Sequence, residues 1–197
     1  QRCDTDFDKS YEWRGGGEFT HQQLLHWVYP YRHVCFTGGE PLNQELLPFF
    51  EDNEHVDMFH IETSGTVDMM PLLHSLYKLY GDTILKERLW VCISPKPGFS
   101  ENTIRDCADE IKVIVPGLGE LTERLSAELG TKTRDFRWPT IEDALRWART
   151  YKRPVFLQPR NAKYDVDKNN LMIVQDIIRD NPELRLSVQL HKILRVQ

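Results

Sequence analysis

The chain has 197 residues, a net charge of −5, 40% apolar residues and 28% charged residues, the composition of an ordinary soluble globular protein. This length suits one domain with a substantial core, so we expect residues 1–197 to form a single domain. No apolar run is long enough to span a bilayer, the acidic amino end is unlike a secretory signal, and no long basic run favours nucleic acid. We therefore expect a cytoplasmic location and a small-molecule partner, without membrane or nucleic-acid binding.

Strand-like and helical patterns alternate along the chain. In chain order, the sequence predicts a helix over 22–28 capped by Thr20, a strand at 32–36, a helix over 42–50, a strand at 56–61, a helix over 68–80, strands at 89–93 and 111–115, a helix over 120–129, a helix from a capping box at 140–143 to about 151, a strand at 154–157, a helix over 168–179 and a strand at 185–190. In the helix over 68–80, one apolar stripe is expected to contain Met69, Leu72, Leu73, Leu76 and Leu79.

This alternation, with strands that are apolar almost throughout, indicates a parallel α/β sheet covered by helices. Ligands of such folds bind beyond the carboxyl ends of the strands. In this chain the expected strand ends carry hydrogen-bonding groups at 37–40, 62–66, 94–96, 116–117 and 158–161. Loops are polar in any sheet, so this pattern alone leaves a purely structural interpretation open.

The segment Thr37-Gly38-Gly39-Glu40-Pro41 follows the first expected strand directly. Its two glycines leave backbone N–H and C=O groups uncovered, and Glu40 adds a carboxylate that is able to hold an amine. The alternative is a tight turn into a helix with Pro41 as an early helical residue.

The chain has four cysteines, and none forms an internal pair at metal-knuckle spacing. Cys35 and Cys92 lie inside apolar strand-like runs, so both are expected to be small core residues, and Cys107 has no motif around it. Cys3 differs because it opens the segment Cys3-Asp4-Thr5-Asp6-Phe7.

Several short motifs, in this order, resemble one known family. Thr37-Gly38-Gly39-Glu40-Pro41 resembles the Gly-Gly-Glu motif of radical S-adenosylmethionine enzymes. The later segments resemble the 7-carboxy-7-deazaguanine synthase family within that superfamily: Glu62-Thr63-Ser64-Gly65-Thr66, Ser94-Pro95-Lys96, Leu157-Gln158-Pro159 and Gln189-Leu190-His191-Lys192, together with the opening Cys3-Asp4-Thr5-Asp6-Phe7.

The resemblance implies a partial parallel (β/α) barrel of the radical S-adenosylmethionine type whose first strand is missing from this chain. It implies a lyase of queuosine-type biosynthesis that contracts 6-carboxy-5,6,7,8-tetrahydropterin to 7-carboxy-7-deazaguanine with loss of ammonia. The implied cofactors are a 4Fe–4S cluster, S-adenosyl-L-methionine and Mg²⁺, since thiolates suit iron–sulfur clusters and oxygen ligands suit magnesium. An electron donor such as flavodoxin or ferredoxin and a homodimer are implied as well.

Site residues are carried over motif by motif. The resemblance assigns a cluster ligand to Cys3, a magnesium ligand to Thr5 and substrate contacts to Thr37 and to the backbone of Gln197. It assigns cofactor binding to Arg2, Cys3, Asp4, Gly39, Ser94, Pro95, Lys96, Gln158, Pro159, Arg160 and Asn161. Glu62 is expected to face the site, or else to cap a helix.

The family's cysteine motif ends in Cys-x-x-Cys-Asp-Thr, so its middle cysteine falls immediately before Gln1. We expect the sequence to be a fragment that holds no cluster by itself, because one thiolate does not replace three. Two alternatives remain open at this point: another radical S-adenosylmethionine enzyme such as an activase, and a non-catalytic relative that binds a pterin or nucleotide.

Overall fold

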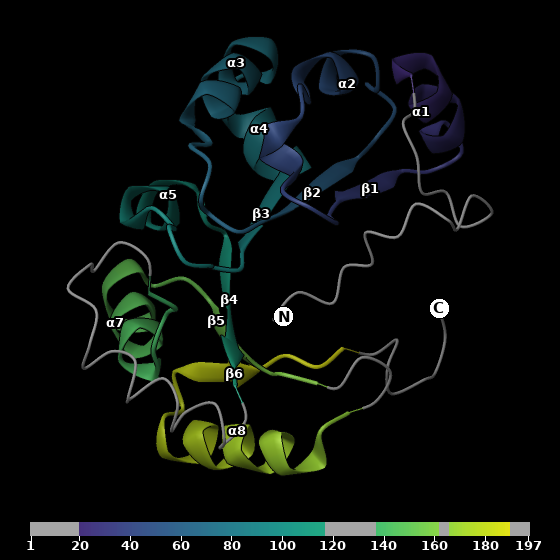
Figure 1. Cartoon of the computed structure of the whole chain (residues 1–197). Helices are drawn as coiled ribbons and strands as arrows, with labels where there is room; N and C mark the ends of the chain where they lie inside the picture. The colour runs from purple at the N-terminus through teal and green to yellow at the C-terminus, as the bar shows by residue number, and fades with distance from the viewer. Residues whose placement is uncertain (1–19, 117–136, 162–165, 190–197) are drawn as a thin grey trace. The chain divides into compact units, whose positions relative to one another are not determined.

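The computed structural model describes residues 20–116, 137–161 and 166–189 (Figure 1). Its helices are α1 (His21–Val28), the 3-10 helix η2 (Pro41–Asn43), α2 (Leu47–Glu51), α3 (Met70–Tyr80), α4 (Asp82–Arg88), α5 (Glu101–Cys107), α7 (Ile141–Tyr151) and α8 (Lys168–Asp180). Its strands are β1 (His33–Phe36), β2 (Met58–Thr63), β3 (Leu89–Ile93), β4 (Glu110–Val115), β5 (Val155–Pro159) and β6 (Leu184–Leu186).

The six strands form one sheet in the order β1-β2-β3-β4-β5-β6, and the pairs β1–β2, β3–β4, β4–β5 and β5–β6 are parallel. The predicted parallel α/β fold is therefore confirmed. A doubly wound sheet reverses its strand order at a switch point, whereas this order simply follows the chain, as in the wall of a (β/α) barrel.

Two compact units divide the described residues. The first consists of the described part of Gln1–Thr63 with Asp68–Val91, and the second of Ser64–Val67 with the described residues from Cys92 onward. The single-domain expectation stays a prediction. Strand β3 contributes residues to both units.

The core of the first unit is aromatic. Phe36 on β1, Phe49 and Phe50 on α2, and Phe59 on β2 form one ring cluster, with Phe50 and Phe59 centroids 4.4 Å apart. The Tyr80 hydroxyl at the end of α3 donates to the Phe50 carbonyl at 2.5 Å. These contacts fix α2 and α3 to the β1–β2 pair.

The core of the second unit lies between the sheet and helices α7 and α8, which pack against β5 and β6 (Figure 1). Its fully buried side chains include Ile111 on β4, Leu157 on β5, Trp147 on α7 and Val174 on α8. The apolar positions of β4 and β5 alternate with half-buried ones, so only one face of each strand enters this core.

Four sequence predictions need correction. The helix expected over 42–50 is split into η2 and α2, because Pro48 has no N–H to continue an earlier helix and lies instead in the first turn of α2. Leu79 is 42% exposed rather than part of the buried stripe of α3. Cys35 is exposed, whereas Cys92 is buried as expected. Helices α4 and α5 were not predicted. The helix expected over 120–129 lies outside the described residues.

Candidate functional site

In the first unit, the ends of β1 and β2 meet around Glu40. The Thr63 hydroxyl, at the end of β2, donates to Glu40 Oε1 at 2.6 Å, and the Leu42 N–H donates to the same oxygen at 3.3 Å. Glu40 thereby caps η2 and joins the two strand ends. The Glu40 carboxylate, which the sequence predicted to hold an amine, therefore also has a structural role.

The Gly38-Gly39 pair occupies an exposed position between β1 and Glu40. Gly38 has φ +90°, a conformation that favours glycine. A Cβ atom built on Gly39 meets no described atom within 4 Å. Among the described residues, the Gly39 backbone is thus open to close approach by a ligand, which fits its predicted role.

The Thr63–Glu40 hydrogen bond yields a first prediction. Replacing Thr63, only 2% exposed, with valine keeps the shape and removes the donor. We expect the free energy of unfolding to fall by about 1.5 kcal/mol, because the bond is to a charged group. Urea unfolding measures this. Ser75→Ala, which removes a hydroxyl bonded to the Pro71 carbonyl in the same unit, is the control and should cost less. Equal losses would contradict the assignment.

In the second unit, the loop Ser94–Ser100 joins β3 to α5 and contains the predicted segment Ser94-Pro95-Lys96. The Lys96 N–H donates to the Ser64 carbonyl at 3.3 Å, and the Ser100 N–H donates to the Gly65 carbonyl at 2.8 Å. Pro95 is buried, while Ser94 and Lys96 are half-buried. The family-like segments 64–66 and 94–96 therefore lie side by side.

Gly65 is required in this packing. It has φ +70°, and a Cβ there would lie 2.9 Å from Ile93 Cγ2. Gly65→Ala is expected to lower the free energy of unfolding by about 2 kcal/mol through backbone strain and the clash. Gly39→Ala, at an open position with no positive φ, is the control for thermal or urea unfolding. A Gly65→Ala protein as stable as this control would refute the prediction.

At the end of β5, Gln158 is half-buried, and the segment beyond it is tied to β4. The Arg160 N–H donates to the Val115 carbonyl, and the buried Asn170 amide donates to the Val115 and Arg160 carbonyls, each at 2.9 Å. Asn161 donates to Gln189 Oε1 and accepts from the Asp167 N–H. The Asn161 side chain therefore joins this segment to Gln189 and Asp167.

Asn170 and Glu101 were not singled out in the sequence. No motif marks Asn170, because its role depends on two carbonyls distant in sequence. Ser100 caps α5 by accepting from the Thr103 N–H. Because serine is a favoured N-cap residue, the start of this helix at Glu101 was predictable from the sequence.

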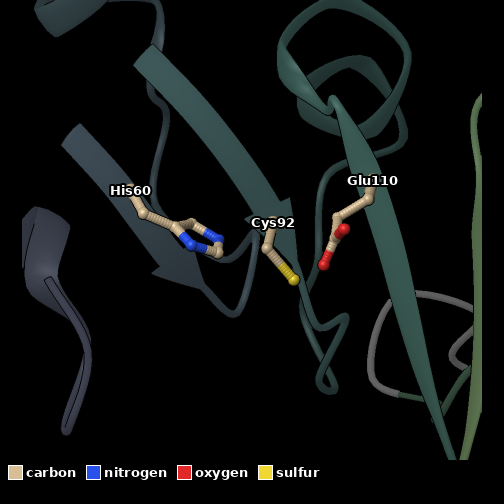
Figure 2. Close-up of side chains that lie close together, drawn as sticks. All are labelled: His60, Cys92 and Glu110. Atoms are coloured by element: carbon tan, nitrogen blue, oxygen red, sulfur yellow. The ribbon is translucent and has the colours of Figure 1, made fainter. Parts of the chain in front are cut away.

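Strands β2, β3 and β4 also carry side chains with polar or sulfur atoms at His60, Cys92 and Glu110. Cys92 on β3 and Glu110 on β4 are Cα partners, and their side chains lie beside each other in Figure 2. His60, labelled in the same figure, belongs to the first unit, and its buried Nε2 has no hydrogen-bond partner among the described residues. Glu62, the other polar residue expected near the site, is half-buried at the end of β2.

The remaining predicted site residues, Arg2, Cys3, Asp4, Thr5 and Gln197, lie outside the described residues, as do Gly117, His191 and Lys192. Of the described ones, Thr37 and Gly39 lie in the first unit, and Ser94, Pro95, Lys96, Gln158, Pro159, Arg160 and Asn161 lie in the second. Their assigned roles stay predictions. Among the described residues, no helix is both long and apolar enough to cross a membrane.

The sequentially ordered sheet defines the class as a parallel α/β protein, with polar groups near the carboxyl ends of several of its strands. Among curated proteins, the chain is similar to the 7-carboxy-7-deazaguanine synthase of Prochlorococcus marinus, at 27% identity over 175 residues, covering 83% of this chain and 67% of that protein. This similarity confirms the resemblance found in the motifs. No protein-family model matches the chain.

Among solved structures, the chain is similar to the crystal structure of QueE from Escherichia coli, with a TM-score of 0.49 and 21% sequence identity. The match covers 87% of this chain and spans 64% of the length of that protein.

Proposed function

We propose that the protein is a 7-carboxy-7-deazaguanine synthase, a lyase that converts 6-carboxy-5,6,7,8-tetrahydropterin to 7-carboxy-7-deazaguanine with loss of ammonia. The observation that carries the proposal is the order of the family-like motifs, several of which lie at or directly after the carboxyl ends of β1, β2, β3 and β5, where the ligand-binding groups of such folds are found. The similarity to a curated synthase supports it.

In this proposal, the backbone of Gly39 binds the amino acid part of S-adenosylmethionine. The open space beside Gly39 among the described residues fits this role, because backbone groups there are accessible to a ligand. Glu40, held by Thr63 and by the Leu42 N–H, keeps this turn in place.

The resemblance also assigns cofactor binding to residues of the second unit. Ser94 and Lys96, after β3, offer a hydroxyl and an ammonium group, and Gln158, near the end of β5, offers an amide. Pro95, Pro159, Arg160 and Asn161 are assigned to cofactor binding as well, although the Arg160 N–H and C=O already bind Val115 and Asn170. Thr37 and the Gln197 backbone are assigned to the pterin substrate.

Cys3 is assigned to a 4Fe–4S cluster and Thr5 to Mg²⁺. When bound, the cluster supplies the electron that cleaves S-adenosylmethionine and so starts the reaction. An external electron donor and a homodimeric assembly belong to the same proposal.

Anaerobic iron and sulfide reconstitution of the full-length protein tests the function. We expect a brown protein whose visible spectrum changes on adding S-adenosylmethionine and which forms 7-carboxy-7-deazaguanine with a reductant present. A protein that takes up no cluster would contradict every radical-enzyme interpretation and favour a non-catalytic relative. A cluster that cleaves S-adenosylmethionine without pterin turnover would favour a different radical enzyme.

A further inference from the structure

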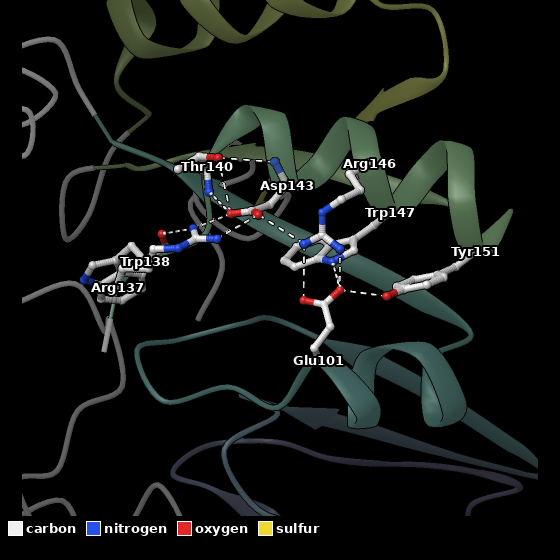
Figure 3. Close-up of polar contacts among 8 residues, drawn as sticks. All are labelled: Glu101, Arg137, Trp138, Thr140, Asp143, Arg146, Trp147 and Tyr151. Carbon is white, nitrogen blue, oxygen red and sulfur yellow. Dashed lines mark hydrogen bonds and ion pairs between the residues drawn. The ribbon is translucent and has the colours of Figure 1, made fainter. Parts of the chain in front are cut away.

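Glu101, the first residue of α5, is held by three side chains of α7 (Figure 3). Its Oε1 accepts hydrogen bonds from Arg146 Nη1, Trp147 Nε1 and the Tyr151 hydroxyl, each at 2.7 Å. Its Oε2 accepts a further bond from Arg146 Nη2 at 3.2 Å. One carboxylate therefore joins the start of α5 to the C-terminal half of α7.

The hydrogen bonds of Glu101 with Arg146, Trp147 and Tyr151 are called the Glu101 clamp below. The surroundings of this clamp are partly apolar. Trp147 is completely buried, and its ring meets the Phe99 ring edge-on at 5.7 Å between centroids. Burial disfavours the charged form of Glu101, but hydrogen bonds from Arg146, Tyr151 and Trp147 outweigh it, so the pKa of Glu101 lies below its usual value. The carboxylate is thus ionised at neutral pH, when its acceptor capacity is greatest.

Arg146 is itself fixed by a second carboxylate. It donates to Asp143 Oδ1 at 3.2 Å, and Asp143 is paired with Arg137 through both of its oxygens (Figure 3). Arg146 therefore bridges Glu101 and Asp143, which limits the orientations available to its guanidinium group.

Glu101 directly follows the loop Ser94–Ser100. The loop is anchored by β3 at one end, by the Ser64 and Gly65 carbonyls along its length, and by the Glu101 clamp at the other end. The Phe99 N–H closes a turn on the Lys96 carbonyl at 2.9 Å. A shift of α5 would therefore be transmitted to Ser94-Pro95-Lys96.

We propose that Glu101 is a positioning residue that, by fixing α5 to α7, holds the Ser94-Pro95-Lys96 loop in the conformation that takes the nucleoside part of S-adenosylmethionine. This inference rests on the proposed function for the identity of the ligand. A carboxylate with directional bonds fixes both the distance and the orientation of α5, whereas an apolar contact allows sliding.

The chain offers a matched control on the same helix. Glu183, just before β6, accepts a hydrogen bond from Arg149 Nε of α7 at 2.7 Å. Glu101→Gln and Glu183→Gln make the same chemical change, and each weakens one Glu–Arg contact of α7.

The first test needs no ligand. We expect amide hydrogen exchange at Lys96, Phe99 and Ser100 to accelerate about tenfold in Glu101→Gln and to stay unchanged in Glu183→Gln, because local opening follows loss of the clamp. Tyr151→Phe, which removes one of the bonds, is a milder variant for use if Glu101→Gln folds poorly. Unchanged exchange in both variants, or equal acceleration in the control, would overturn the positioning role.

The second test measures binding to the reconstituted full-length protein. The Kd for S-adenosylmethionine should rise about tenfold in Glu101→Gln, while the Kd for the pterin and the affinity of Glu183→Gln for both ligands stay within about twofold. Accelerated exchange without loss of cofactor affinity would overturn the link to the cofactor. If the unaltered protein binds no S-adenosylmethionine, both the proposed function and the connection between Glu101 and the cofactor fail. Hydrogen exchange then remains the test of whether Glu101 holds the Ser94–Ser100 loop.

Discussion

Replacing Asp143 by alanine is expected to lower the free energy of unfolding by about 3 kcal/mol at neutral pH, because it removes a buried carboxylate and leaves its cationic partners without it. Asp143 is 6% exposed and accepts from the side chains of Arg137 and Arg146. It also completes the capping box of α7, accepting from the Thr140 N–H at 2.9 Å. The substitution therefore removes the Asp143 half of the capping box and the contacts with two arginines together.

The effect should depend on pH in a defined direction. Burial opposes ionisation of Asp143, but the Arg137 side chain, the Thr140 N–H and Arg146 outweigh it and lower its pKa from 3.8 to about 2. Since the carboxylate is stabilised in the folded state, its contribution is complete above the unfolded pKa and is lost as the pH falls from 3.8 through about 2. About half of the ionisation contribution should remain at about pH 3.

Urea unfolding of the Asp143→Ala and unaltered proteins between about pH 3 and pH 7 measures this dependence. Glu142→Ala, an exposed neighbour in the same turn of α7, is the control and should change the free energy of unfolding by less than about 0.5 kcal/mol. A stability difference for Asp143→Ala that stays constant down to the acid end of this range would contradict a stabilising ionised carboxylate.

Replacing Gly39 by valine is expected to raise the Kd for S-adenosylmethionine by about a hundredfold, because the new side chain fills the space through which a ligand reaches the backbone. No described atom lies within 4 Å of a Cβ at this position, and Gly39 has no positive φ. Valine should therefore be accommodated by the fold, and the loss should be confined to binding. Calorimetric titration of the reconstituted protein provides the measurement.

Gly81→Ala is the control that distinguishes a loss of cofactor binding from a loss of stability. Gly81 has φ +76°, so alanine there costs conformational energy, although its Cβ would likewise meet no described atom within 4 Å. Gly81 ends α3, away from the strand ends, and this variant should lose stability while keeping its affinity for S-adenosylmethionine. Equal affinities of Gly39→Val and Gly81→Ala for the cofactor would refute the role assigned to Gly39.

The regular elements with strong local signals were predictable from sequence. The capping boxes at Thr20 and Thr140 mark the starts of α1 and α7, and β3 spans the predicted residues 89–93. The short elements depended on tertiary packing. Helix α2 is shortened because Pro48 must lie in its first turn, and Cys35 is exposed although its apolar strand favoured burial.

The candidate site was predictable only as a set of strand ends. The sequence located the polar segments after β1, β3 and β5, because motifs and strand patterns are local. It did not reveal the Thr63–Glu40 bond, the Asn170 bridge to Val115 or the Glu101 clamp, since each joins residues far apart in the chain. Such contacts depend on the register of the sheet and on helix packing.

The central claim is the ring contraction itself, and product formation tests it most directly. The full-length protein, reconstituted with iron and sulfide under anaerobic conditions, should convert 6-carboxy-5,6,7,8-tetrahydropterin to 7-carboxy-7-deazaguanine when S-adenosylmethionine, Mg²⁺ and a reductant are supplied, as followed by mass spectrometry. A cluster-loaded protein that cleaves S-adenosylmethionine yet leaves the pterin unchanged would contradict the proposed function.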